Sequence, residues 1–93
     1  NKLLSVNSYK NCGIIFVCLL FAKENYLKID YADLLDKIKS KIEKINEFNL
    51  EYFEIRDEIT LEHFNIPNSN KRFRGFICVK VEGIRLIDNL LLD

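Results

Sequence analysis

A hairpin near the end of the chain constrains the fold more than any other feature of the sequence. Two runs rich in Val, Ile and Phe extend from Phe73 or Gly75 to Val81 and from Ile84 to Asn89, and such runs are typical of strands. Glu82-Gly83 separates them, and a two-residue connection containing Gly predicts a tight turn between antiparallel strands. The chain is therefore expected to contain an antiparallel sheet.

The length of this turn also predicts the register of the two strands. Val81 should pair with Ile84, and Val79 with Leu86. Because side chains alternate between the two faces of a sheet, the register puts the apolar ones on one face, where helices can cover them. The predicted apolar face contains Ile77, Val79, Val81, Ile84 and Leu86, together with Phe53 and Ile55.

The first half of the chain predicts two helices. Ser5 is placed to cap a helix from about Val6 to Lys23 or Glu24, with Leu4 and Tyr9 at the positions of a hydrophobic staple. Asp30, with Asp33 three residues later, caps the second helix. Apolar residues recur along the second helix at helical spacing, which indicates one buried side: Tyr31, Leu34, Leu35, Ile38, Ile42 and Ile45.

Apolar residues surround the axis of the first predicted helix instead of forming one stripe. The run from Cys12 to Ala22 is eleven residues long, against about 20 for a helix that spans a membrane, so we expect no membrane span. A domain of this size can hardly cover two faces of one helix. We therefore expect part of this surface to contact the rest of a longer protein, or a second copy in a homo-oligomer.

The fold class follows from these elements. From Leu50 to Arg56 the sequence period changes to two, which predicts a third strand. Thr60 to Phe64 suggests a short turn of helix, and Pro67 to Asn70 a loop. The expected fold is α+β, with two helices packed on one face of a three-stranded antiparallel sheet. Residues 1–93 suit a single domain.

The balance of charges in the sequence excludes two classes of partner. Fourteen basic and fourteen acidic residues cancel, so we expect neither nucleic acid nor a membrane surface as a partner.

The cysteines indicate the redox compartment. Cys12, Cys18 and Cys78 are odd in number, lie among apolar neighbours and lack C-x-x-C spacing. This pattern favours buried thiols in a reducing compartment, and hence a cytoplasmic protein.

The sequence offers little for catalysis, and we expect no catalytic residue in this chain. His63 is the only histidine, and no Ser or Cys is placed beside it by the sequence. The three glycines form no phosphate-binding loop. Acidic residues are scattered by strand alternation and by loops, so we also expect no metal site among Glu51, Glu54, Asp57, Glu58 and Glu62.

Lys80 and Arg85 are the candidate ligand-binding residues of the sheet. The predicted register places them side by side on the polar face, where two like charges cost stability unless an acidic group lies near. Glu54, or a partner outside the chain, could supply that charge. Two readings remain open: a surface ion pair with Glu54, or a pair of cations that closes over a phosphate or carboxylate held by a neighbouring domain.

Several motifs together resemble the pantoate-beta-alanine ligase family. The segment from Glu51 to Asp57 resembles the family's Asp-Tyr-x-Glu-Ile-x-Asp strand, and Thr60-Leu61-Glu62 resembles the Thr-Leu-Glu that follows it. The segment from Arg85 to Asn89 is similar to an Arg-Leu-Ile-Asp-Asn motif near the family's C-terminus. Asn1 followed by Leu4-Ser5 resembles the end of Ser-Ser-Arg-Asn-x-x-Leu-Ser, which in the family comprises the phosphate-binding loop and the start of the next helix.

This resemblance implies that residues 1–93 are the C-terminal lid domain of a longer two-domain enzyme. The partner would be the enzyme's own N-terminal nucleotide-binding domain, which holds the substrates pantoate, beta-alanine and ATP. The implied reaction forms pantoyl adenylate and pyrophosphate from ATP with magnesium, and beta-alanine then displaces AMP to give pantothenate. Asn1 would lie at the edge of the ATP phosphate loop.

The isolated fragment is then expected to be inactive and to hold no cofactor of its own. The absence of methionine and the start at Asn1 agree with a piece of a longer polypeptide. Three positions depart from the family pattern: Ser8 stands where Glu or Gln usually completes a capping box, Tyr9 replaces an expected Arg, and the turn reads Glu82-Gly83 instead of Gly followed by a polar residue.

Two alternatives stay open at this point. The chain could be a non-catalytic α+β protein-interaction module that docks through its apolar first helix, with coincidental matches to the ligases. It could also be a stand-alone enzyme, in which case the chain alone would release AMP from ATP with pantoate and beta-alanine.

Overall fold

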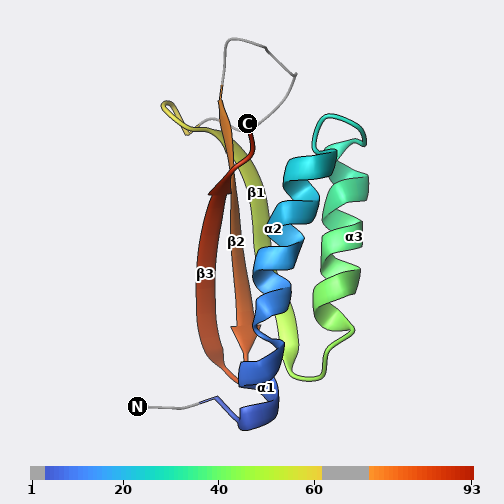
Figure 1. The fold of residues 1–93 in the computed structure, drawn as a ribbon, viewed down its shortest axis with the longest axis vertical. Helices are drawn as coiled ribbons and strands as arrows, with labels where there is room; N and C mark the ends of the chain where they lie inside the picture. Colours follow the sequence, from blue (N-terminus) through green and yellow to red (C-terminus); the bar gives the residue numbers. More distant parts are fainter. Residues whose placement is uncertain (1–3, 62–71) are drawn as a thin grey trace.

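The computed structural model describes residues 4–61 and 72–93, which fold into a layer of helices on a layer of strands (Figure 1). The two layers lie side by side, with α2 and α3 running along one face of the sheet (Figure 1). The elements are α1 Val6–Asn11, α2 Gly13–Asn25, α3 Tyr31–Glu43, β1 Phe48–Asp57, β2 Phe73–Val81 and β3 Ile84–Leu91. The predicted α+β class and the predicted layers are confirmed.

The sheet is antiparallel with strand order β1-β2-β3, so β2 is the central strand. Val81 pairs with Ile84 and Val79 with Leu86, as the length of the turn predicted. Strand β2 begins at Phe73, the earlier of the two predicted starts. Strand β3 runs two residues beyond its predicted end, because Leu90 and Leu91 continue the pairing with the first part of β2.

Strand β1 contains a bulge that the sequence period did not predict. Leu50 pairs with Val79 and Tyr52 with Cys78, so Glu51 is an extra residue between two consecutive pairs. Strict alternation would put Phe48 and Phe53 on opposite faces, since they are five positions apart. The extra residue reverses the alternation, and both phenylalanines are buried.

The core lies between the helices and the covered face of the sheet. Leu34, Ile38 and Ile42 of α3 are completely buried there. At about 25 cal/mol per Å² of apolar surface, burial of such side chains is the main stabilising term of a domain this small. The other fully buried side chains are Cys18, Leu19, Ala22, Phe53, Ile55, Ile77, Cys78, Val79 and Val81.

The first predicted helix is in fact two helices, because the chain tightens at Cys12. The Cys12 N–H donates to the Tyr9 carbonyl oxygen at 3.3 Å, and the Ile15 N–H donates to the Cys12 carbonyl oxygen at 3.1 Å. Both bonds span three residues instead of four, and the weak helix former Gly13 follows at once. The prediction of one continuous helix was therefore wrong.

Both predicted helix caps are present. The Ser8 N–H donates to Ser5 Oγ at 3.2 Å, and the Asp33 N–H donates to Asp30 Oδ1 at 3.0 Å. The predicted hydrophobic staple between Leu4 and Tyr9 is not present. Leu4 packs against the core, whereas the Tyr9 side chain is exposed.

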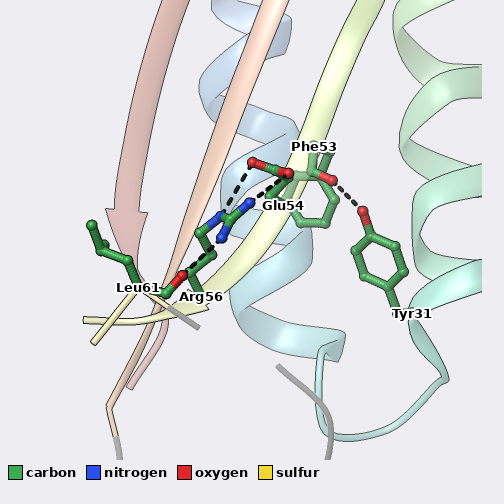
Figure 2. Close-up of polar contacts among 5 residues, drawn as sticks. All are labelled: Tyr31, Phe53, Glu54, Arg56 and Leu61. Carbon is green, nitrogen blue, oxygen red and sulfur yellow. Dashed lines mark hydrogen bonds and ion pairs between the residues drawn. The ribbon is translucent and has the colours of Figure 1, made fainter. Parts of the chain in front are cut away.

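A tight turn follows β1. The buried Asp57 carboxylate accepts from the N–H groups of Ile59 at 2.8 Å and Thr60 at 2.9 Å. Leu61 has a φ of 62°, and Arg56 Nη1 donates to its carbonyl oxygen at 2.8 Å (Figure 2). A right-handed helical turn starting at Thr60 cannot pass through that conformation, so this prediction fails at Leu61. The remainder of the predicted turn, 62–64, and the predicted loop from Pro67 to Asn70 lie outside the described residues.

Candidate functional site

The candidate cations Lys80 and Arg85 lie next to each other on the open face of the sheet. They pair directly across β2 and β3, as the register predicted. Both contact the same carboxylate: Glu51 Oε2 lies 2.7 Å from Arg85 Nε, and Glu51 Oε1 lies 3.7 Å from Lys80 Nζ. The acidic partner is therefore Glu51 and not Glu54.

The bulge in β1 explains why Glu51, and not Glu54, contacts Lys80 and Arg85. Alternation extended back from Phe53 and Ile55 would direct Glu51 toward the helices. On the other side of the bulge, however, Glu51 follows the inward-facing Leu50, and its carboxylate reaches the open face. Glu54 instead accepts from its strand neighbour Arg56, with 3.0 Å between Oε2 and Nη2 (Figure 2). The sequence analysis did not identify Glu51 as the partner of these cations. The signal was that Phe48 and Phe53, two large apolar residues at an odd spacing, can both be buried only if β1 contains a bulge between them.

The charges of this cluster do not cancel. Partial desolvation alone would raise the pKa of Glu51, but the charge and hydrogen bond of Arg85, a hydrogen bond from Cys78 and the charge of Lys80 together lower it below its ordinary value. Glu51 is thus ionised at neutral pH and offsets one of the two cations. The Lys80 and Arg85 side chains are 49% and 56% exposed, so their excess positive charge is accessible to an anion.

Two other arginines on the described strands differ from this pair. Arg56 has Glu54 as its own carboxylate, and Arg74 has Glu58 at 2.7 Å and Asn89 Oδ1, also at 2.7 Å. One cation with its own anion forms a neutral surface pair, which typically contributes about 0–1 kcal/mol to stability. An excess of positive charge distinguishes the Lys80 and Arg85 pair from both of these arginines.

The thiols show no sign of activation. All three are free, with Cys18 and Cys78 buried and Cys12 half-buried. Burial raises the pKa of Cys18 to about 11, only partly opposed by the charge of Lys41, and it raises the pKa of Cys78 as well. A nucleophilic cysteine needs the opposite shift. These cysteines therefore pack as small apolar side chains.

Within residues 4–61 and 72–93, no group of three or more His, Cys, Asp or Glu side chains is arranged to hold a metal ion. The described helices include none that is long and apolar enough to cross a membrane. Asn1, Glu62 and His63 lie outside the described residues.

The outer edge of β1 is closed by side chains of α3. The Tyr31 hydroxyl donates to the Phe53 carbonyl oxygen (Figure 2), and the two rings stack with their centroids 6.1 Å apart. The Leu50 N–H donates to Glu43 Oε2 at 3.1 Å. A hollow of about 320 Å³ lies between these elements, with Leu35 and Lys39 in its wall. Because both contacts satisfy backbone groups of an edge strand, they protect β1 from pairing with another chain.

One side of α1 and α2 exposes an apolar stripe, here called the α1–α2 face. Val6 and Tyr9 are each 73% exposed, and Phe16, Val17 and Leu20 are 47%, 51% and 40% exposed. Gly13 lies between Tyr9 and Phe16 in the sequence, at helical spacing from both, and a Cβ placed on it would meet no atom within 4 Å. The expectation that this small domain cannot cover both sides of its first helical segment is confirmed.

The sequence is similar to known proteins along nearly its whole length. The family model described as Pantoate-beta-alanine ligase matches residues 1–91. A pantothenate synthetase of Flavobacterium psychrophilum is 35% identical over 92 residues, which are 99% of this chain and 33% of the relative. A pantothenate synthetase of Christiangramia forsetii is 31% identical over 93 residues, which are 100% of this chain and 33% of the relative.

The fold has a solved counterpart. A crystal structure of pantothenate synthetase from Thermus thermophilus superposes with a TM-score of 0.75 at 24% identity, over 96% of this chain and 32% of that one. The chain thus spans about a third of the length of the curated relatives it matches.

Proposed function

The chain belongs to the pantoate-beta-alanine ligase family, and on this basis we propose that it forms the C-terminal lid domain of a two-domain pantothenate synthetase. Family membership contradicts the alternative in which the ligase motifs of a small interaction module are coincidental. The remaining two thirds of the relatives' length is ample for the nucleotide-binding domain that the proposal requires.

The α1–α2 face is the observation that carries the proposal. Its five apolar side chains are exposed in the isolated chain, although a polar surface would be expected there in an independent domain. We propose that this face docks on the N-terminal nucleotide-binding domain of the same polypeptide. Gly13, which leaves open space at the centre of the face, would allow the backbone of that domain to approach closely.

A covering domain fits the chemistry of the proposed reaction. The complete enzyme would condense pantoate with ATP to give pantoyl adenylate and pyrophosphate, and beta-alanine would then displace AMP to form pantothenate. An acyl adenylate is destroyed by water, so a domain that closes over it protects the intermediate. Among the described residues, no three His, Cys, Asp or Glu side chains are grouped so that they could hold a metal ion, and we assign no step in this chain to the magnesium of this reaction.

The two positions proposed to contact ligands are Asn1 and the Lys80–Arg85 pair. Asn1 would border the loop that holds the ATP phosphates. Lys80 and Arg85 would contact a phosphate or carboxylate of a substrate bound by the other domain, and their shared, exposed charge supports this role. The free thiols support a reducing compartment, and we place the enzyme in the cytoplasm.

A substrate-omission assay tests the proposed reaction. The complete polypeptide that contains this chain is incubated with ATP, magnesium, pantoate and beta-alanine, and AMP and pantothenate are quantified. We expect stoichiometric AMP and pantothenate, and no sustained AMP release when pantoate is left out. AMP release that does not depend on pantoate would contradict the proposal.

A further inference from the structure

The carboxylate of Glu82 holds the first turn of α1 from the far end of the sequence. Its Oε1 accepts from the Ser5 N–H at 2.9 Å, and its Oε2 accepts from Ser5 Oγ at 2.6 Å and Ser8 Oγ at 2.5 Å. The backbone N–H of Glu82 donates to the Glu47 carbonyl oxygen at 3.2 Å. Glu82 therefore joins three segments that meet at one end of the molecule: the start of α1, the α3–β1 connection and the β2–β3 turn (Figure 1).

The backbone at Glu82 does not favour a glutamate. Glu82 has a φ of 52° and Gly83 a φ of 82°, so both central residues of the hairpin are left-handed. Turns of this type prefer Asn, Asp or Gly at the first position, because other side chains are strained there. The advantage of glutamate at this position must therefore come from what its side chain contacts.

Those contacts reproduce half of a capping box. In a capping box, a Glu or Gln three residues after the N-cap reaches back to the backbone N–H of the N-cap residue. Here the N-cap is Ser5, and the residue three positions later is Ser8, whose side chain is too short for this task. Glu82 supplies the missing acceptor from another part of the chain, and Ser8 is buried beneath it.

The first turn of α1 has no carboxylate of its own that could replace Glu82 as this acceptor. The first turn of α1 contains no acidic residue, so the negative charge that favours a helix N-terminus also comes from Glu82. Loss of the carboxylate would leave the Ser5 N–H and the Ser8 hydroxyl without the acceptor they have in the structure. The start of α1 would then be tied to the sheet much less firmly.

We infer that Glu82 is a positioning residue, which completes the cap of α1 from the hairpin and thereby fixes the segment from Ser5 to Ser8, at the start of α1, relative to the sheet. This inference rests on the proposed function, in which Asn1, four positions before Ser5 in the sequence, borders the ATP phosphates. Glu82 would not touch ATP itself. Its loss should weaken ATP binding through the position of that segment while leaving the reacting groups unchanged.

The test uses the complete polypeptide with Glu82→Asn, alone and combined with Ser8→Glu. Asparagine is a residue that this turn prefers, so the single variant keeps the hairpin and removes the carboxylate that completes the cap. Ser8→Glu then restores an ordinary capping box within α1. We expect Glu82→Asn to raise KM for ATP about fivefold with kcat changed less than about twofold, the size expected when a shift of the start of α1 weakens one hydrogen bond to ATP. The double variant should return KM to near the wild-type value.

A KM for ATP that does not change in Glu82→Asn, or that rises and is not restored by Ser8→Glu, overturns the inference. KM for beta-alanine serves as an internal control and should not change. The proposed function is tested separately by the wild-type protein: if the wild type releases no pantoate-dependent AMP, that proposal fails. The inferred cap is then judged by amide hydrogen exchange, which should be faster in the first turn of α1 in Glu82→Asn and slow again in the double variant, with equal rates in all three overturning it.

Discussion

Glu51 accepts a hydrogen bond from Arg85 at 2.7 Å, although Glu51 lies on β1, Arg85 lies on β3 and β2 runs between them. Glu51 lies at the bulge of β1, two residues after Asn49, which pairs with Lys80, so the Glu51 side chain is on the same open face. The same carboxylate also reaches Lys80 on the intervening strand. One acidic residue thus connects all three strands and leaves a net positive charge at the place where a substrate anion is proposed to bind.

The variant Glu51→Gln should make stability less sensitive to acid. The pKa of Glu51 lies below its ordinary value of 4.5 in the folded state, so its contribution is present above that value and is lost as the pH falls through the folded-state pKa. Urea unfolding of residues 1–93 between about pH 7 and about pH 3 measures this, and the difference between wild type and variant should narrow on acidification. Glu24→Gln, on an exposed part of α2, is the matched control. Equal acid sensitivity of wild type and Glu51→Gln would refute the argument.

Removal of either open-face cation should weaken substrate binding in the complete enzyme. In Lys80→Ala and Arg85→Ala we expect KM for ATP or for pantoate to rise by about tenfold, equivalent to about 1.4 kcal/mol, which is typical of one charge-assisted contact. Steady-state kinetics at low ionic strength is the measurement. Arg74→Ala is the control, because Arg74 lies on the same strand as Lys80 but has Glu58 as its own partner. Unchanged kinetics in both test variants would contradict a role in substrate binding, and Lys80 and Arg85 would then only form surface ion pairs with Glu51.

The Tyr26 side chain links the end of α2 to Asp93, and the variant Tyr26→Phe should remove this link. The Tyr26 hydroxyl donates to Asp93 Oδ1 at 2.7 Å, and its loss should lower the free energy of unfolding by about 1 kcal/mol. Desolvation, followed by the hydrogen bond and charge of Asp93, raises the pKa of Tyr26 from 10.0 to about 12.

The raised pKa of Tyr26 adds an alkaline signature. Between its two values the folded state keeps a proton that the unfolded state loses, so this stabilising contribution is complete below pH 10 and declines as the pH rises toward about 12. Chemical denaturation across this range should show a steeper loss of stability in the wild type than in Tyr26→Phe. Tyr9→Phe, at an exposed tyrosine, should behave as the wild type does. An identical alkaline slope in Tyr26→Phe would show that the anchor contributes nothing.

Leu19 and Leu20 are consecutive residues of α2, but the Leu19 side chain lies in the core and the Leu20 side chain lies on the α1–α2 face. In residues 1–93, Leu19→Ala should cost about 2–5 kcal/mol because Leu19 is completely buried, whereas Leu20→Ala should cost well under about 1 kcal/mol. In the complete polypeptide, the cost of Leu20→Ala should rise if the other domain covers this side chain. Thermal and urea unfolding of both variants in both contexts make the comparison. Indifference of the complete enzyme to Leu20→Ala would argue against docking through this face.

Features of the fold that depend on neighbouring residues could be predicted from the sequence. The Glu82-Gly83 turn determines the pairing of Val81 with Ile84, and Asp30 caps the helix that begins at the next residue. The adjacency of Lys80 and Arg85 followed from the same turn. In each case the residues that decide the structure lie within a few positions of one another.

Features that depend on packing between distant segments could not be predicted. The bulge at Glu51 exists because both Phe48 and Phe53 are buried under the helices, and only the assembled core requires that. The bond from Glu82 to Ser5 crosses 77 positions of sequence, and no local pattern specifies it. Position 8 held the one clue, since a serine stands there where a capping box has Glu or Gln.

The most direct test of the central claim compares residues 1–93 alone with the complete polypeptide in one assay of AMP release from ATP, pantoate and beta-alanine. The account predicts that residues 1–93 fold but release no AMP above the rate without protein, while the complete polypeptide turns over all three substrates. Pantoate-dependent AMP release by residues 1–93 alone would contradict it, because the chain would then be a complete enzyme and not a covering domain.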